Sequence, residues 1–270
     1  MMDKLDRRIL YELDKNARIT STALGKQIRR SKQFVDYRIK RLGEEGILLG
    51  HTAVIDYSRL GYQSVRVYFK FHNITPSQQD ILENDLIADK EVWWLVTLEG
   101  VWDVGYAMAI KNMLEFYPYW DKLMKKYRHV IRKHSVVIYT HIMQYPKSYL
   151  LDKENEHDGT IVGAQQRTVS VDQLDLRILR RLSSDGRVTL LSLANDNNTS
   201  PQVIRNRMQR LEREGIILGY RALIDTSVFG YRYYKAYINL LNTDKLRALN
   251  EYCKHHPNML NINRTIGGHD

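Results

Sequence analysis

The chain has 270 residues, of which 43% are hydrophobic and 27% are charged, a balance that predicts a globular protein of several domains. No apolar run approaches the ~18 residues of a membrane span, and the first residues lack the apolar core of a signal peptide, so we expect a cytoplasmic protein with no membrane partner. The single cysteine, Cys253, excludes an internal disulfide framework and a multi-cysteine metal site.

The formal net charge of +10 suggests a polyanionic partner, and its distribution shows where that partner would bind. Residues 1–62 carry 13 Lys and Arg against 8 Asp and Glu, whereas residues 172–231 carry 9 against 7. These two segments are copies of each other. Asp3 to Tyr62 aligns without a gap on Asp172 to Tyr231, with 26 of 60 positions identical. An offset of 169 residues is too long for a solenoid repeat of about 20 to 50 residues and indicates a duplicated module of several elements.

Each copy begins with about 50 residues that predict three helices. Apolar residues at helical spacing mark the first helix, a threonine precedes a short second helix, and Ser31 and Ser200 precede the third. Pro201 after Ser200 suits the first helical position, and Gly46 and Gly215 end the third helix. The tight connection between the second and third helices is typical of a helix-turn-helix.

Period-two alternation then replaces helical spacing and predicts strands. Residues 63–149 follow the order strand, helix, strand, strand, helix, strand, which is the ferredoxin-like pattern. In the second copy, Tyr234, Ala236, Ile238 and Leu240 alternate in phase with the first strand of this pattern. The second copy stops at Asp270, the counterpart of Asp103, so we expect a partial second domain and a chain that is a fragment.

The sequence therefore predicts an α+β protein. The expected units are a helix-turn-helix domain at 1–61, a ferredoxin-like ligand-binding and dimerisation domain at 62–149, a polar linker at 150–171, a second helix-turn-helix domain at 172–230 and a partial second ferredoxin-like domain at 231–270.

The third helix carries the residue types that reading a DNA duplex requires. We expect Lys32, Gln33 and Asp36 to contact bases in the major groove, and Arg29, Arg38 and Arg41 to contact phosphates. The alternative is a solvated helix face in which the arginines retained in both copies form ion pairs inside the domain, with Glu45 and Glu214 or with Asp6 and Asp175. The complete predicted DNA-binding set is Arg29, Arg30, Ser31, Lys32, Gln33, Asp36, Tyr37, Arg38, Lys40, Arg41, Ser200, Gln202, Arg205, Arg207 and Arg210.

Several of these motifs together resemble the Lrp/AsnC family of transcriptional regulators, and the second copy repeats them. The resemblance rests on Leu5-Asp6-x-x-Ile9-Leu10, Asn16-Ala17-Arg18-Ile19, Ser31-x-x-x-Val35-x-x-Arg38-Ile39-x-x-Leu42 and Gly46-Ile47-x-x-Gly50. It implies a winged helix-turn-helix followed by a ferredoxin-like domain, double-stranded DNA as a partner, and an amino acid or related small molecule as an effector. It also implies a homo-oligomer, or here an internal pseudo-dimer of the two copies.

The residues before the third helix depart from the family's apolar-Gly-apolar pattern. The first copy has Ile28-Arg29-Arg30 and the second has Asn197-Asn198-Thr199. Asn198 can take the positive φ that glycine would supply, whereas Asn197 stands where Ile28 is expected to be buried. We therefore expect the second copy to bind DNA more weakly.

The resemblance maps a ligand site onto Gly100, Trp102 and Asp103, and in the second copy onto Gly267 and Asp270. The alternative is a tight turn in which glycine supplies backbone freedom and aspartate bonds the turn. Trp93, Trp94 and Trp102 are bulky for an amino-acid pocket and suit a sheet core or an interface.

No catalytic residue, metal site or cofactor is expected. The sequence contains no Walker, Rossmann or Gly-x-Ser-x-Gly motif, and His255-His256 suits a helix end. Siroheme decarboxylases resemble the same family and are the enzyme alternative, but their histidine-rich signature is not recognised here. An amino-acid sensor or assembly scaffold that does not bind DNA is the third alternative.

Overall fold

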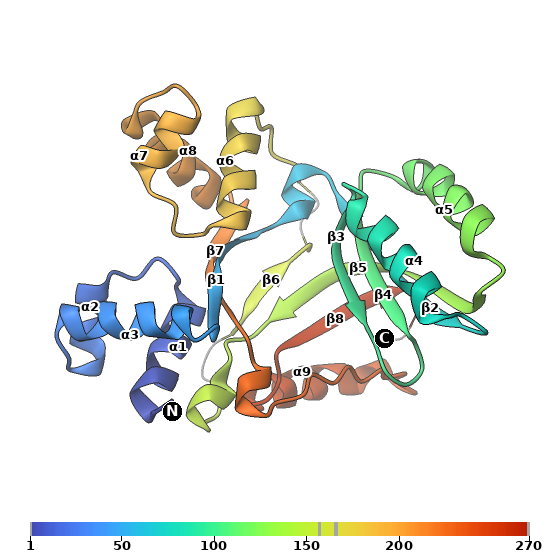
Figure 1. Cartoon of the computed structure of the whole chain (residues 1–270), viewed down its shortest axis with the longest axis horizontal. Helices are drawn as coiled ribbons and strands as arrows, with labels where there is room; N and C mark the ends of the chain where they lie inside the picture. The colour runs from blue at the N-terminus through green and yellow to red at the C-terminus, as the bar shows by residue number, and fades with distance from the viewer. Residues whose placement is uncertain (1, 156–157, 165–166, 269–270) are drawn as a thin grey trace.

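The computed structural model describes residues 2–155, 158–164 and 167–268 and divides them into two lobes (Figure 1). One lobe holds the helix-turn-helix units, with α1 to α3 and α6 to α8 at one end of the molecule. The other lobe is an α/β unit with α4 and α5 at the opposite end. Within the described ranges, every helix is too short or too polar to cross a membrane.

The two helix-turn-helix units have the same order of elements, three helices and a strand. The first consists of α1 (Lys4–Lys15), α2 (Ser21–Ile28), α3 (Lys32–Glu44) and β1 (Leu48–Ile55), and the second of α6 (Gln173–Ser184), α7 (Leu190–Asp196), α8 (Pro201–Arg213) and β7 (Ile217–Ile224). The predicted caps are present: Ser31 and Ser200 each accept a hydrogen bond from the backbone N–H three residues on. The repeated sequence therefore forms the same local structure twice.

The strands that follow the two units pair with each other as an antiparallel ribbon of β1 and β7. Thr52 lies opposite Arg221, its own counterpart in the second copy, and His51 lies opposite Ala222 just as Tyr220 lies opposite Ala53. Such self-matching contacts define a two-fold axis. The two units are thus related by a local two-fold axis within one chain, at the ribbon.

The α/β lobe confirms the ferredoxin-like prediction for the first copy. A 3-10 turn η1 (Tyr57–Leu60) leads into β2 (Gln63–Phe71), α4 (Pro76–Ala88), β3 (Val92–Thr97), β4 (Val104–Ile110), α5 (Met113–Tyr127) and β5 (Ile131–Gln144). The sheet order is β3-β4-β2-β5 with antiparallel neighbours. Alternate residues of β2, including Val65, Val67 and Phe69, are fully buried against α4 and α5. The side of the sheet that faces away from α4 and α5 is here called the open face. It carries Arg66 and Tyr68, and other parts of the chain bury both side chains.

The prediction that residues 150–171 are only a polar linker is wrong. A 3-10 turn η2 (Ser148–Leu151) packs Tyr149 and Leu150 into the core of the first helix-turn-helix unit. A short strand, β6 (Thr160–Val162), pairs with β5 and buries Val162. Apolar residues too few to show a period were enough to attach this segment to both lobes.

The predicted strand through Tyr234, Ala236, Ile238 and Leu240 is also wrong, because residues 231–240 have no strand assignment. Its counterpart β2 is a central strand with partners on both sides, β4 and β5. No strand in the described part of the second copy takes those places. The segment instead lies against the open face, where Tyr237 packs on Tyr68.

The remainder of the second copy extends the sheet of the first. After η3 (Ser227–Phe229), η4 (Thr243–Lys245) and α9 (Leu246–His255), β8 (Asn261–Ile266) pairs antiparallel with β5. The predicted partial domain at 231–270 therefore does not stand alone, since β8 shares a sheet with the first copy. His269 and Asp270 lie outside the described residues.

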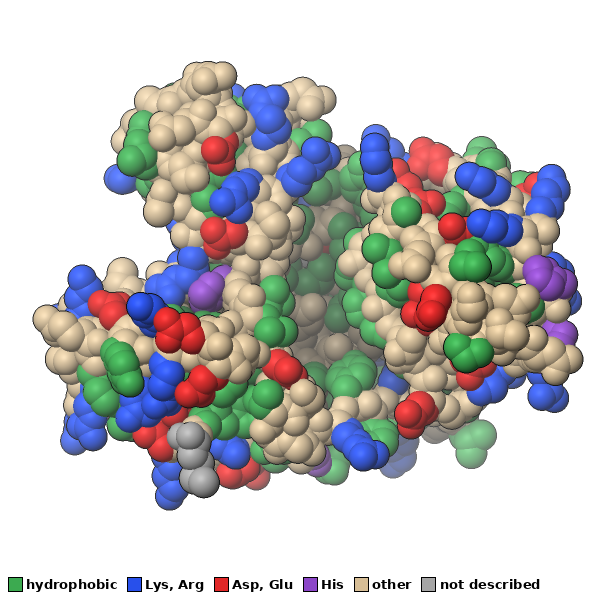
Figure 2. All heavy atoms as spheres, viewed as in Figure 1, with side chains coloured by type: hydrophobic (Ala, Val, Ile, Leu, Met, Phe, Trp, Pro, Cys, Tyr) green, Lys and Arg blue, Asp and Glu red, His purple; other side chains and the backbone are tan. Residues whose placement is uncertain are grey.

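A large cleft separates the lobes, and Figure 2 shows it as a hollow with hydrophobic side chains on its walls. Its volume is about 890 Å³, and its lining comes from the ribbon on one side and from β3, β5 and β6 on the other.

Candidate nucleic-acid interface

The turn between α2 and α3 is tight and requires an unusual backbone. Arg29 ends α2 in the left-handed region with φ of +55°, and its counterpart Asn198 has φ of +50°. Asparagine tolerates this conformation better than arginine does. The prediction for Asn198 is therefore confirmed, and Arg29 takes the same backbone conformation despite its long side chain.

The predicted DNA-binding residues divide into two groups by exposure. The exposed group, here called the recognition face of each unit, consists of Arg29, Arg30, Ser31, Lys32, Gln33, Asp36, Tyr37 and Lys40 in the first copy and Ser200, Gln202 and Arg205 in the second. Arg38, Arg41, Arg207 and Arg210 are only partly exposed. Except for Lys40, the exposed residues lie in or just before the first turns of α3 and α8, which suits contact with base edges.

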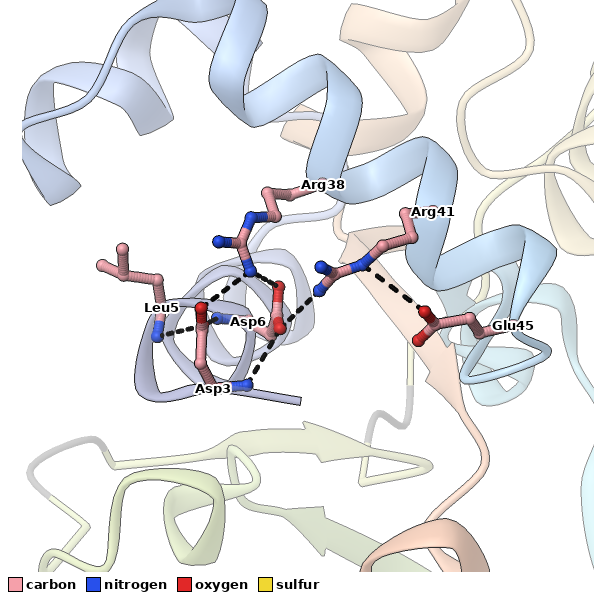
Figure 3. A network of polar contacts seen from close by, with 6 residues as sticks. All are labelled: Asp3, Leu5, Asp6, Arg38, Arg41 and Glu45. Atoms are coloured by element: carbon pink, nitrogen blue, oxygen red, sulfur yellow. Dashed lines mark hydrogen bonds and ion pairs between the residues drawn. The ribbon is translucent and has the colours of Figure 1, made fainter. Parts of the chain in front are cut away.

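The partly exposed arginines bind aspartates of the same unit, as Figure 3 shows for the first copy. Nη1 of Arg38 lies 2.8 Å from Asp3 and 3.0 Å from Asp6, and Nη2 of Arg41 lies 2.5 Å from Asp6. The Asp6 side chain has no exposed surface. The assignment of Arg38 and Arg41 to phosphates is therefore corrected: the structure places their guanidinium groups in the intradomain ion pairs that the alternative proposed.

The second copy repeats this cluster. Arg207 lies 2.6 Å from Asp172 and 3.3 Å from the buried Asp175, and Arg210 also bonds Asp175. The N–H of Asp175 and the Arg207 guanidinium hold the pKa of Asp172 below its ordinary value. In the first copy, partial burial opposes ionisation, but the Asp6 N–H and Arg38 still hold the pKa of Asp3 below its ordinary value. These carboxylates therefore fix the third helix on the first helix in both units.

Paired backbone contacts connect the two units across the local two-fold axis. The N–H of Ala17 donates to the Tyr220 carbonyl at 2.8 Å, and the N–H of Gly186 donates to the His51 carbonyl at 2.8 Å. Arg18 donates to the carbonyls of Gly186 and Val188, while its counterpart Arg187 donates to that of Ile19. Arg18 stands in a motif that both copies share, but no contact between the units was predicted for Arg18 or Arg187.

A buried carboxylate, Asp14, links the first unit to the ribbon and to the end of β5. Its side chain has no exposed surface and lies 2.5 Å from both Lys147 and Arg221. Burial alone would disfavour its charged form, but Lys147 and Arg221 hold its pKa below the ordinary value. No sequence motif signals this cluster, because its members are up to 207 residues apart.

Asn197 is accommodated by hydrogen bonds where Ile28 is buried in the first copy. Its amide donates to the Leu193 carbonyl at 2.8 Å and accepts from Arg177 at 2.7 Å. The weaker DNA binding of the second copy stays a prediction. The prediction now rests on the recognition face of the second copy, which is smaller than that of the first. Within it, the Gln202 amide donates a hydrogen bond to Asn206 at 2.9 Å.

The predicted ligand residues have two kinds of surroundings, one shared by Gly100 and Asp103 and the other around Trp102. Lys70 donates to the Gly100 carbonyl at 2.9 Å and pairs with Asp103 at 2.5 Å, and Asp103 also accepts the N–H of Phe71 at 2.8 Å. These contacts favour the alternative interpretation, in which Gly100 and Asp103 form a tight turn. Trp102 is buried and lines a cavity on the open face.

Among the described residues, no group of three or more His, Cys, Asp or Glu side chains is placed to hold a metal ion. Cys253 is buried on α9, where burial raises the pKa of its thiol.

Fold and site together define a protein with two winged helix-turn-helix units and a ferredoxin-like sheet. Residues 2–48 and 171–217 each match the family model of the winged helix-turn-helix DNA-binding domain. The leucine-responsive regulatory protein of Rhizobium meliloti is 43% identical over 63 residues, which cover 23% of this chain and 40% of that protein. The transcriptional regulator Ptr1 of Methanocaldococcus jannaschii is 31% identical over 113 residues, which cover 42% of this chain and 75% of that protein.

The chain therefore belongs to the Lrp/AsnC family, in a form with a duplicated helix-turn-helix. It spans about two fifths of the length of the first curated relatives that it matches. Among solved structures, the siroheme decarboxylase NirDL has a similar fold, with a TM-score of 0.59 and 14% identity over 99% of this chain and 82% of that chain. At this level of identity, the likeness shows a similar fold and no more.

Proposed function

We propose that the protein is a sequence-specific DNA-binding transcription regulator of the Lrp/AsnC type. The observation that carries the proposal is the pair of recognition faces, each at the start of a helix-turn-helix and related by the local two-fold axis at the β1–β7 ribbon. Two-fold related helices suit the two half-sites of a DNA operator. DNA as a partner also agrees with the cytoplasmic location expected from the sequence.

The proposed roles follow exposure and chemistry. Lys32, Gln33 and Asp36 contact base edges, because their side chains are exposed at the start of α3. Arg30 and Lys40, which are exposed and do not bind aspartate, contact phosphates. Arg38 and Arg41 position α3 on α1 through Asp6, and thereby orient the recognition face.

The proposal is tested by measuring DNA affinity against salt concentration for the intact chain and for Arg30→Ala. Removing one phosphate contact is expected to weaken binding to every sequence and to reduce the slope of log K against log salt by about one. Lys125→Ala is the control, because this lysine is exposed on α5 in the other lobe. Identical affinity and slope for Arg30→Ala and the native chain would remove Arg30 from the interface, and salt-independent binding would end the DNA proposal.

An amino-acid effector and further oligomerisation are a second part of the proposal, supported by family membership. A calorimetric screen of amino acids against the intact chain tests the effector. If no amino acid binds, Gly100 and Asp103 act only in the turn.

A decarboxylase-like activity is the second candidate, because the fold of NirDL covers nearly the whole chain. Titration with an iron porphyrin distinguishes it. A shifted porphyrin absorbance band that persists at high salt would favour this candidate over the regulator.

A further inference from the structure

A second site lies on the open face of the α/β lobe, away from both recognition faces. It is a cavity of about 160 Å³ between β2 and β5 on one side and residues 233–240, α9 and β8 on the other. Residues of both copies are needed to enclose it. Among its lining residues, only Trp102 was predicted to contact a ligand.

One end of the cavity holds a lysine surrounded by aromatic rings. The Nζ of Lys235 donates to the hydroxyl of Tyr139 at 2.7 Å and to that of Tyr68, and the two hydroxyls are 3.0 Å apart. The ammonium also lies 4.3 Å from the ring centroid of Tyr68 and 4.7 Å from that of Tyr237. Within the described ranges no carboxylate pairs with Lys235, so its third N–H is left for another acceptor.

A second cation on the same face, Arg66, likewise has no carboxylate partner among the residues that the structure describes. Arg66 is only 8% exposed, and its guanidinium carbon lies 4.2 Å from the ring centroid of Trp94 and 4.5 Å from that of Tyr139. Its Nε is buried and has no hydrogen-bond partner in the described part of the chain. Buried charge of one sign is costly unless an opposite charge is supplied. The face therefore favours an anion.

Most of the remaining wall is apolar, from Val137, Ile238, Leu246, Leu249 and Met259, and Asn250, Asn261 and Asn263 complete it. None of the described residues that line it is an aspartate or glutamate, whereas Arg264 adds a further cation. A cavity of about 150 Å³ accommodates a group the size of benzene. The ligand that fits thus has one anionic end and a compact apolar body.

We infer that this cavity binds a small monocarboxylic acid with an apolar chain, whose carboxylate meets Lys235, Tyr68 and Tyr139. A free amino acid is a poorer ligand, because its ammonium group would find no carboxylate partner and would face Lys235 and Arg264. A phosphate is poorer because apolar walls leave most of its oxygens unpaired. This inference does not depend on DNA binding.

Lys235 is prepared for an anion by its surroundings. Burial, and then the charge of Arg66, lower its pKa to about 7. A bound carboxylate would favour the charged ammonium and raise this pKa. Binding is therefore expected to take up a proton at neutral pH.

The test is calorimetric titration of the intact chain with 4-methylpentanoate, its amide and leucine, which share one carbon skeleton. We expect saturable binding of the acid with a Kd of about 1 mM or tighter. The amide lacks the charge and leucine adds an ammonium group, so each should bind at least about tenfold more weakly. Equal binding of acid and amide, or no saturable binding of the acid, would overturn the inference.

Two variants locate the site. Lys235→Gln removes the charge, and Tyr139→Phe removes one hydroxyl but keeps the ring that covers Arg66. Each change should lower the affinity for 4-methylpentanoate by about tenfold. The variant Lys125→Gln, at an exposed position on α5, should bind this acid as tightly as the native chain does. Thermal unfolding of each variant verifies that it folds. Unchanged affinity in a folded Tyr139→Phe chain would contradict the assignment even if Lys235→Gln were unfolded.

The pH dependence gives an independent check. Because neutral Lys235 donates poorly, affinity for the acid should fall by about tenfold between pH 6 and pH 8. The other titratable or charged side chains at or beside this site are Arg66 and Tyr68 on β2, Tyr139 and His141 on β5, Tyr233, Tyr234 and Tyr237, Cys253 on α9 and Arg264 on β8. Burial raises the pKa of Tyr68, Tyr139, Tyr237 and Cys253, and burial with the charge of Arg264 lowers the pKa of His141. A flat profile, or tighter binding at pH 8, would refute Lys235 as the anion contact.

Discussion

At the scale of single residues, the most informative side chain is Asp6, which is buried and repeated as Asp175. It accepts hydrogen bonds from Arg38, Arg41 and the N–H of Asp3, and so connects α1 to α3. An arginine on a recognition helix is commonly taken as a phosphate contact. Here the retained arginines have a structural reason to be retained, and most of the exposed residues around them differ between the copies.

We predict that Asp6→Ala lowers the free energy of unfolding of the first helix-turn-helix unit by about 3 kcal/mol. The reason is that two partly buried arginines lose their carboxylate. Glu45→Ala is the matched control, since its carboxylate is 41% exposed and lies 3.6 Å from Arg41, and its loss should cost less than about 1 kcal/mol. Urea denaturation followed by circular dichroism measures both. Equal shifts for the two variants would show that Asp6 is no more than a surface ion pair.

At the scale of elements, the β1–β7 ribbon determines how the two units are placed. It brings counterpart residues face to face, and Arg18 and Arg187 reach across it to opposite carbonyls. The second unit approaches β1 closely at Gly186. A Cβ atom added there would lie 2.8 Å from the carbonyl carbon of Thr52. Its counterpart in the first copy is Ala17, which is fully buried.

We predict that Gly186→Ala separates the ribbon from α6 and destabilises the helix-turn-helix lobe by about 2 kcal/mol, because the added methyl group meets backbone atoms that cannot rotate away. Gly43→Ala is the control. Gly43 lies inside α3 with no neighbour closer than 3.9 Å to the added carbon, so this change should stabilise by about 0.5 to 1 kcal/mol. Thermal unfolding compares them. A neutral Gly186→Ala would mean that the ribbon adjusts without loss.

At the scale of the whole molecule, one chain presents two recognition faces that are held by one axis but differ in chemistry. Asp36 and Tyr37 on α3 correspond to Arg205 and Asn206 on α8. A homodimer must read two identical half-sites, whereas this arrangement does not require that.

We predict that selection from a random DNA pool with the intact chain yields two different half-sites at one fixed spacing. The double variant Arg205→Asp and Asn206→Tyr makes the recognition face of α8 more like that of α3, and its selected sites should become more nearly palindromic. Gln209→Lys, which changes a position further along α8, is the control and should leave the base preference unchanged. Identical half-sites for the native chain would show that the two recognition faces read the same bases, and would contradict the prediction.

The sequence by itself determined the elements that are fixed by local interactions. Caps at Ser31 and Ser200, apolar spacing and the alternation of β2 predicted both helix-turn-helix units and the ferredoxin-like order, because hydrogen bonds and side-chain periodicity act over a few residues. The exposed recognition residues followed from the same periodicity.

Only the tertiary structure decided what depends on partners distant in sequence. Residues 231–240 alternate as a strand does but lack neighbouring strands, and residues 150–171 look like a linker yet contain β6, which pairs with β5. The ion pairs of Arg38 and the cavity around Lys235 follow the same rule. A charged side chain takes its role from the groups that folding places within a few ångströms, and the sequence of each segment does not specify those groups.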